Sequence, residues 1–346
     1  KWLYYVYDPV TCLIRYFGSK THEGGLRIRR GTGARVNEAF VIQQILEDWS
    51  NRRYRREEMA WLAWLLRFVL PTTKEPQDRF LSVPNAYSPV LGKYGPWYHI
   101  VIDEAQDLSV VEASLLSSFV MRDGALTIAA DFRQVVSPVH GMTNPDAFRF
   151  GCNLLIQTDE FTRFPFTRNM RQTAQIGRFL RGFYEKAFGE LPQFMTNESM
   201  TGPKPQLHLM PYHRFAQTIQ KMLNVFRKKN LSGSMAFLQI NEDEEELMRY
   251  RGMFEKENIR LAPVWESFSS QGDLVTTSTE RIKGLEYDIC FVTGLEKTDH
   301  TSLNFNINRA YVALSRPTRR LYMLCEHIPA LLHGINTDLY DVFDNR

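Results

Sequence analysis

The chain repeatedly places short apolar runs between stretches that have helical spacing. One run covers residues 99–102 and a second covers 126–130, with the helical stretch 111–119 between them. Short apolar runs are typical of strands inside a parallel sheet, because helices cover both faces of such a sheet. The pattern therefore predicts an α/β fold with central parallel sheets. Further predicted strands cover residues 2–7, 235–240, 274–278, 289–293 and 321–325.

The length and the predicted helices indicate two domains. At about 150 residues per domain, 346 residues suggest two. A boundary near residues 155–165 separates two α/β halves, which we place at 1–158 and 159–346. Predicted helices cover residues 37–48, 56–70, 171–188, 215–229 and 242–257.

Composition excludes several classes of protein. Lys and Arg total 42 against 39 Asp and Glu, a mildly basic balance that permits a basic groove without requiring nucleic acid. The most apolar stretch, residues 59–69, is interrupted by Arg67 and is shorter than the ~20 residues of a membrane span. We expect no membrane association and a cytoplasmic protein. Its four widely spaced cysteines are expected to be reduced thiols: Cys12, Cys152, Cys290 and Cys325.

Two adjacent carboxylates follow the first apolar run. Residues 100–107 read I-V-I-D-E-A-Q-D, so Asp103 and Glu104 stand at the carboxyl end of a predicted strand, where α/β sheets bind ligands. Asp103 is placed to hold Mg²⁺, directly or through water, because Mg²⁺ takes few carboxylates beside phosphate oxygens. Glu104 is placed to orient or deprotonate a water that attacks a phosphate. The alternative, two solvated acids at a turn, is disfavoured by the full string D-E-A-Q-D.

This string resembles the Walker B motif (motif II) of superfamily 1 helicases of the UvrD/Rep/PcrA type. Four further segments follow in that family's order. Residues 130–134 (A-D-F-R-Q) resemble motif III, and residues 168–172 (R-N-M-R-Q) resemble motif IV. Residues 278–286 (S-T-E-R-I-K-G-L-E) resemble motif V, and residues 311–316 (Y-V-A-L-S-R) resemble motif VI. The resemblance implies two RecA-like domains of the P-loop NTPase type, with ATP and Mg²⁺ between them, in a DNA helicase or translocase.

The resemblance also implies a role for each polar residue of these motifs. Gln134 would sense the γ-phosphate, and Glu286 would accept a hydrogen bond from the ribose. Arg171 would contact phosphate and Arg316 would be the arginine finger, a group that contributes ~10³–10⁵ in rate. A guanidinium suits phosphate oxygens through its permanent charge and planar donors; the alternative for either arginine is a surface ion pair. The first half would supply Asp103, Glu104 and Gln134, and the second Arg171, Glu286 and Arg316.

The nucleic-acid contacts rest on weaker similarity. The resemblance implies that single-stranded DNA, or DNA with a single-stranded tail, meets Ser278 and Lys283 of motif V, with 3′-to-5′ movement. Residues 2–11 faintly resemble motif Ia, in which Tyr7 would meet the strand; an ordinary buried strand tyrosine is the alternative. The family's aromatic base-stacker after motif III is absent or replaced by His140, and Glu280 stands where the family has His. Both departures weaken the inference to processive unwinding.

The family's phosphate-binding loop, G-x-x-x-x-G-K-S/T, is not found in these 346 residues. The nearest string, residues 18–21, lacks the first glycine and leads into a Gly-rich loop rather than a helix. If residues 2–11 are motif Ia, the loop is expected just upstream of Lys1, which makes the first domain incomplete at its amino end. The chain alone is then expected to show little ATPase activity.

The spacing of the motifs indicates a compact core. Between motifs IV and V there is no room for the family's large accessory domain, and residues 22–90 are expected to form a small 1B-like insertion. Two other functions stay open. One is a catalytically dead scaffold that binds DNA or a protein partner, for example in a repair or defence complex. The other is an enzyme directed at RNA.

Overall fold

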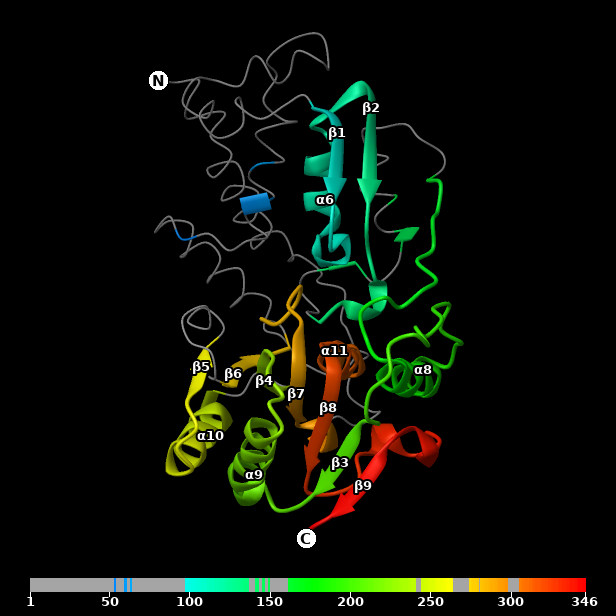
Figure 1. Ribbon diagram of the computed structural model, residues 1–346. Coiled ribbons are helices and arrows are strands. Elements are labelled where there is room, and N and C mark those ends of the chain that lie inside the picture. Colours follow the sequence, from blue (N-terminus) through cyan, green and yellow to red (C-terminus); the bar gives the residue numbers. More distant parts are fainter. Residues whose placement is uncertain are drawn as a thin grey trace, which may run out of the picture. The chain divides into compact units, whose positions relative to one another are not determined.

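The computed structural model (Figure 1) describes the following residues of the chain: 53, 59–60, 63, 97–136, 141–142, 145–146, 149, 161–240, 244–263, 274–279, 281–297 and 305–346. The chain divides into two compact units. The first comprises Lys1–Phe132 and His140–Phe161, and the second comprises Arg133–Val139 and Thr162–Arg346. The predicted boundary after residue 158 stays a prediction. The predicted strand 2–7, the helix 37–48 and the 1B-like insertion lie outside the described residues, apart from isolated positions.

The first unit contains a parallel pair of strands. β1 (Trp97–Ile102) pairs with β2 (Val120–Ile128), with Ile102 opposite Ile128. The 3₁₀ helix η2 (Ala105–Asp107) and the helix α6 (Val110–Ser117) follow β1. Ser109 begins α6 with a capping box, because its hydroxyl accepts the Glu112 N–H and the Glu112 carboxylate accepts the Ser109 N–H. Contrary to the expectation of a fully buried strand, only Ile102 of β1 is buried, and Val101 is 66% exposed.

The second unit contains a seven-stranded sheet in which every strand pair is parallel. Its order is β5-β6-β4-β7-β8-β3-β9. The predicted α/β fold class with central parallel sheets is therefore confirmed. The strands are β3 (Gln206–Leu209), β4 (Met235–Gln239), β5 (Leu261–Pro263), β6 (Leu274–Ser278), β7 (Tyr287–Thr293), β8 (Pro317–Cys325) and β9 (Asp341–Asp344).

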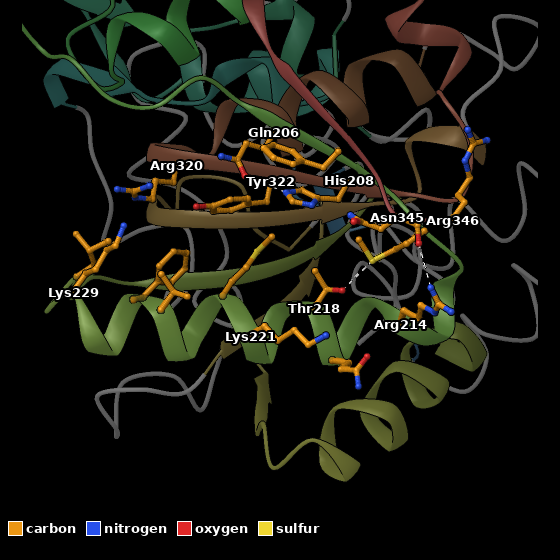
Figure 2. Close-up of a pocket in the computed structure, with 17 residues that line it drawn as sticks. Gln206, His208, Arg214, Thr218, Lys221, Lys229, Arg320, Tyr322, Asn345 and Arg346 are labelled. Atoms are coloured by element: carbon orange, nitrogen blue, oxygen red, sulfur yellow. Dashed lines mark hydrogen bonds between the residues drawn. The ribbon is translucent and has the colours of Figure 1, made fainter.

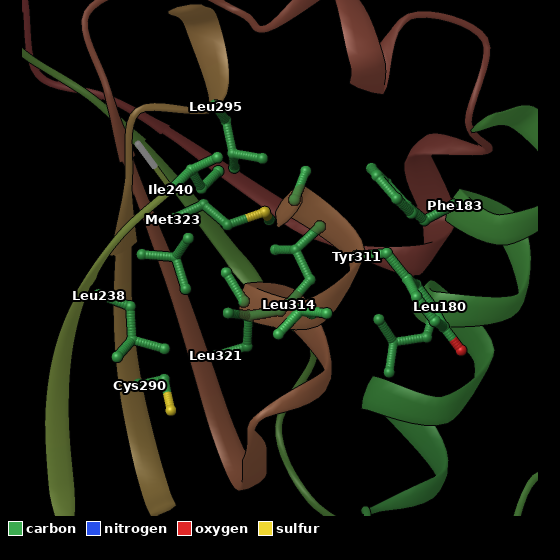
Figure 3. Packing of buried hydrophobic residues seen from close by; sticks show 14 of the residues in the cluster. Leu180, Phe183, Leu238, Ile240, Cys290, Leu295, Tyr311, Leu314, Leu321 and Met323 are labelled. Carbon is green, nitrogen blue, oxygen red and sulfur yellow. The ribbon is translucent and has the colours of Figure 1, made fainter. Parts of the chain in front are cut away.

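Helices cover both faces of this sheet. On one face the buried cluster includes residues of α9 (Phe215–Lys228) and α10 (Glu244–Lys256), and α9 runs alongside the strands (Figure 2). On the other face the cluster includes residues of α8 (Ala174–Phe188) and α11 (Phe305–Ser315); Leu180 of α8 lies beside Tyr311 of α11, and Leu314 of α11 lies beside Leu321 of β8 (Figure 3). Shorter 3₁₀ helices are η3 (Phe132–Gln134), η4 (Tyr212–Arg214), η6 (Leu295–Lys297), η7 (Ala330–Leu332) and η8 (Thr337–Leu339).

Strand β4 illustrates why this sequence forms a sheet covered on both sides. Leu238 and Ala236 belong to the cluster with α8 and α11, whereas Phe237 belongs to the cluster with α9 and α10. Because successive strand side chains point to opposite faces, both kinds of position must be apolar. The centroid of the Phe237 ring lies 5.0 Å from that of Tyr250 and 4.9 Å from that of Phe254, and both of these residues are on α10.

The two cysteines that the structure describes, Cys290 and Cys325, are buried free thiols. Burial raises the pKa of both well above the usual value, so both are protonated at neutral pH. Among the described helices, none combines the length and the apolar character that crossing a bilayer needs.

Gly252 offers a test of how α10 is stabilised. It is exposed within the helix, and a Cβ atom at this position would meet nothing within 4 Å. Since glycine in a helix costs about 0.5–1 kcal/mol relative to alanine, Gly252→Ala is expected to raise the free energy of unfolding by that amount. Urea denaturation followed by circular dichroism measures it. Gly294→Ala is the opposite control: Gly294 has φ +90°, a conformation that alanine disfavours, so this variant should be less stable.

Candidate functional site

The predicted acid pair lies in the first unit at the carboxyl end of β1. Asp103 is exposed, and its carboxylate accepts the backbone N–H of Glu104 at 2.9 Å. Glu104 has φ 50° and ψ 38°, the left-handed conformation. The other non-glycine residues with positive φ in the described part of the chain are Asn230 and Asn258. Asparagine tolerates this conformation, whereas for glutamate it stores strain, and strain of this kind clusters at functional sites.

Gln106 connects this acid pair to the segment after β2. Its side chain is completely buried, and its amide nitrogen donates to the Glu104 carboxylate. Its amide oxygen accepts the backbone N–H of Asp131 at 3.0 Å. Gln106 therefore fixes the Glu104 side chain relative to the start of the motif III segment. The sequence contained this glutamine in the D-E-A-Q-D string, but local spacing gave no sign of its bridging position.

In the second unit, two predicted site residues from distant parts of the chain meet. A terminal nitrogen of Arg316 donates to the Gln134 side-chain oxygen at 2.7 Å. Arg316 is only 1% exposed, and its Nε donates to the Val312 carbonyl oxygen at 3.1 Å. Its other terminal nitrogen donates to the Leu285 carbonyl oxygen at 3.4 Å. The guanidinium therefore has a fixed position, unlike the surface ion pair that was the alternative.

The segment that carries Gln134 is held against α11. The Val135 carbonyl oxygen accepts from Asn308 at 2.8 Å, and the Val136 carbonyl oxygen accepts from Arg309 at 3.0 Å. These contacts are consistent with residues 133–139 grouping with the second unit, although we expected the first half to supply Gln134. Neither Asn308 nor Arg309 stands in a motif, so the sequence gave no signal for them.

A second pair joins the motif IV and motif V segments. The Arg171 Nε lies 2.5 Å from a Glu286 carboxylate oxygen. The two side chains are 41% and 42% exposed, so both face solvent at this end of the unit. An exposed pair of this kind contributes little stability, and a ligand can exchange its partners at low cost. The structure thus brings together the residue predicted for phosphate and the residue predicted for ribose.

Gln172 links these two pairs and was missed by the sequence reasoning. It is 3% exposed, and its amide nitrogen donates to the Ser315 carbonyl oxygen at 2.8 Å and to that of Pro317 at 3.2 Å. These carbonyls flank Arg316 on both sides. Its amide oxygen accepts from Asn169 at 2.7 Å. Gln172 therefore fixes the backbone of Arg316 from the residue next to Arg171, and that adjacency was the only signal in the sequence.

Ser278, predicted to meet the nucleic acid, lies at the opposite end of the sheet from Glu286 and Arg316, which are predicted to meet the nucleotide. Arg316 directly precedes β8 and Glu286 directly precedes β7, so both lie at the amino ends of their strands. Ser278 is the last residue of β6 and is 8% exposed, which places it at the opposite, carboxyl end. Lys283 is half-buried in the connection between β6 and β7. The remaining predicted or departing positions lie outside the described residues: Tyr7, His140 and Glu280.

Burial shapes the electrostatics around Arg316. The Cys290 thiol is fully buried nearby, and burial raises its pKa even though the positive charge of Arg316 acts to lower it. The thiol is therefore neutral at pH 7. Burial also raises the pKa of Tyr287, the first residue of β7.

Comparison with known proteins gives remote structural likeness only. No family model and no curated protein matches the chain. The C-terminal domain of a possible DNA helicase from Lactobacillus plantarum WCFS1 is similar at 14% identity and TM-score 0.40, covering 50% of this chain and 97% of that domain. The PRRSV helicase is similar at 14% identity and TM-score 0.34, covering 66% of this chain and 34% of that one. At these scores neither likeness carries an argument, so function is inferred from the chain's own residues.

Proposed function

We propose that this chain is the core of an ATP-dependent nucleic-acid motor of the superfamily 1 helicase type, made of two RecA-like domains. The observation that carries the proposal lies in the second unit. Gln134, Arg171, Glu286 and Arg316 come from four separate motifs, and they form two contacting pairs joined through Gln172. A charged fork of donors beside an amide and a carboxylate matches what a nucleoside triphosphate offers: phosphate oxygens and ribose hydroxyls.

The first unit would bind the metal ion and direct the attacking water. The Asp103 carboxylate is exposed, and among the described residues it accepts a hydrogen bond only from the adjacent Glu104 N–H. One accessible carboxylate fits Mg²⁺, which keeps several waters and takes its remaining ligands from phosphates. Glu104 would orient or deprotonate the attacking water, and Gln106 would hold the Glu104 carboxylate in position. When bound, Mg²⁺ would neutralise charge on the phosphates.

The nucleic-acid partner is proposed to be single-stranded DNA, or DNA with a single-stranded tail, with movement from 3′ to 5′. Ser278 and Lys283 of the motif V segment are the described candidates for its contact. Ser278 lies at the carboxyl end of β6, away from the amino-end pairs, whereas Lys283 lies in the connection that leads from β6 to Glu286. This connection would link the contact with the strand to the nucleotide residues.

Phosphate release, measured with and without an oligothymidylate, tests the catalytic part of this proposal. The expected turnover of the chain alone is small, because these 346 residues contain no G-x-x-x-x-G-K-S/T loop to hold the β- and γ-phosphates. Robust turnover that Glu104→Gln abolishes would show that another segment replaces the loop. Robust turnover that Glu104→Gln leaves intact would contradict the assignment of Glu104.

A further inference from the structure

A groove in the same unit lies beside α9. It has a volume of about 830 Å³ and is lined by α9, by β3 and β8, and by the end of β9 (Figure 2). Its accessible apolar surface comes from Met222, Val225 and Phe343, and the buried side chains of Met210, Phe226 and Tyr322 lie behind it. Methionine side chains adapt to varied apolar partners, which suits a groove that receives another chain.

The rim of this groove is positively charged. Lys221 is exposed on α9, Lys229 is exposed directly after the helix, and the Arg320 guanidinium lies 5.9 Å from the centre of the Phe226 ring. Arg214 stands at the other end, where it donates to the Asn345 carbonyl oxygen at 3.2 Å. None of the lining residues, all within the described part of the chain, is acidic. Such a rim favours an anionic occupant.

His208 adds an unpartnered polar atom to the same wall. Only 6% of this residue is exposed, and its ring stacks on the Phe343 ring with 4.8 Å between the two ring centroids. Its Nε2 bonds to Gln206 at 3.1 Å, whereas its Nδ1 has no hydrogen-bond partner among the described residues. Burial lowers the pKa of His208 to about 4, so the ring is neutral at pH 7 and adds no charge to the groove.

The position of the groove favours a helix as its occupant. In an α/β fold helices cover both faces of a parallel sheet, yet on this face the buried cluster contains residues of α9 and α10 only, among the described helices. The groove lies beside α9, along β8, β3 and β9. α9 has 14 residues and is therefore about 21 Å long, enough to guide a helix of about four turns.

A single nucleic-acid strand fits the same surface less well. Strands of this kind bind by stacking bases on exposed aromatic faces. Here Phe226 is 5% exposed and Tyr322 is 4% exposed, and one face of the more accessible Phe343 is already covered by His208. An apolar floor with a basic rim is instead the complement of a helix that has an apolar stripe and acidic flanks.

We propose that this groove binds an acidic amphipathic helix of a protein partner. The proposal is independent of the nucleotide chemistry at the amino ends of the strands. It assigns Lys221 and Lys229 to the acidic flank of that helix, and Phe343 to its apolar stripe.

Fluorescence anisotropy with a labelled synthetic peptide tests this proposal. The probe is a four-turn peptide with leucine at helical spacing and glutamate on both flanks. We expect saturable binding by the chain that weakens about tenfold in the double variant Lys221→Glu with Lys229→Glu. The matched control is Lys228→Glu, an exposed lysine of the same helix that does not line the groove, which should leave binding unchanged.

A second pair of variants tests the apolar floor. Phe343→Ala should weaken peptide binding, whereas Val342→Ala, on the opposite face of the same exposed strand, should not. A peptide of the same composition in scrambled order should bind at least tenfold more weakly. Equal binding of the scrambled peptide, or no effect of the lysine variants, would overturn the proposal. So would binding of an oligothymidylate that depends on Lys221 and Lys229 when the peptide does not bind.

Discussion

Arg316→Met is expected to weaken binding of a fluorescent ATP analogue at least tenfold and to lower the free energy of unfolding by about 1–3 kcal/mol. Methionine fills the space of the buried stem, but the Gln134 side-chain oxygen and the Leu285 carbonyl oxygen lose their bonds to the guanidinium, and an unsatisfied buried polar group carries a cost of that size. A hydrogen bond to a charged group contributes about 1.5–3 kcal/mol, or roughly ten- to a hundredfold in affinity. Fluorescence titration measures the affinity, and urea denaturation measures the stability.

The combination of the two results separates a functional arginine from a structural one. A variant that unfolds at lower urea yet binds the nucleotide as before would show that Arg316 only supports the fold. Arg178→Met is the matched control. Arg178 pairs with Glu198 on the surface, and both side chains are about half exposed, so this change should alter neither quantity.

Gln172→Leu is expected to lower the free energy of unfolding by about 2 kcal/mol. The leucine leaves the buried carbonyls of Ser315 and Pro317, and the amide of Asn169, without the bonds that Gln172 makes now. An unsatisfied buried polar group costs about 1–3 kcal/mol. The denaturation midpoint in urea should fall with an unchanged slope.

This change should also weaken nucleotide binding, because Gln172 fixes the backbone on both sides of Arg316. Gln217→Leu is the control: Gln217 is exposed on α9, and changes at such sites are usually within about 0.5 kcal/mol. Full stability together with full nucleotide binding in Gln172→Leu would remove Gln172 from the account.

The sequence was sufficient to predict the sheet where burial and backbone geometry agree. β4, β6, β7 and β8 each contain a run of apolar or β-branched residues long enough to be recognised, and the helix predicted between β4 and β6 favours parallel pairing of these two strands. β3, β5 and β9 were not predicted, because they have only three or four residues. β9 reads D-V-F-D and is exposed at every position, so neither alternation nor burial marks it as a strand.

Helices could be predicted where their sequences have one apolar face and one polar face. α8 and α9 have one apolar face and one polar face, and their predicted ranges differ from the observed ones by a few residues. α11 was not predicted as a helix. It is buried at most of its described positions, so its sequence lacks the polar face that makes helical spacing visible.

The site residues could be named from motif resemblance, but their contacts could not. Gln134 and Arg316 are 182 positions apart, and no local pattern states that they bond. The same holds for Asn308, which reaches a backbone carbonyl 173 positions away. Contacts of this kind depend on how the strands and helices pack, which a single sequence does not specify. The roles of these residues in nucleotide chemistry stay predictions.

The most direct test of the central claim is whether nucleotide changes the affinity for a single strand. Anisotropy of a labelled oligothymidylate should be measured with the chain alone, with magnesium and a non-hydrolysable ATP analogue at saturation, and with magnesium and ADP. The account predicts dissociation constants that differ several-fold between these states in the unaltered chain and converge in Arg316→Met. Equal dissociation constants in all three states of the unaltered chain, or no binding of the strand, would contradict it.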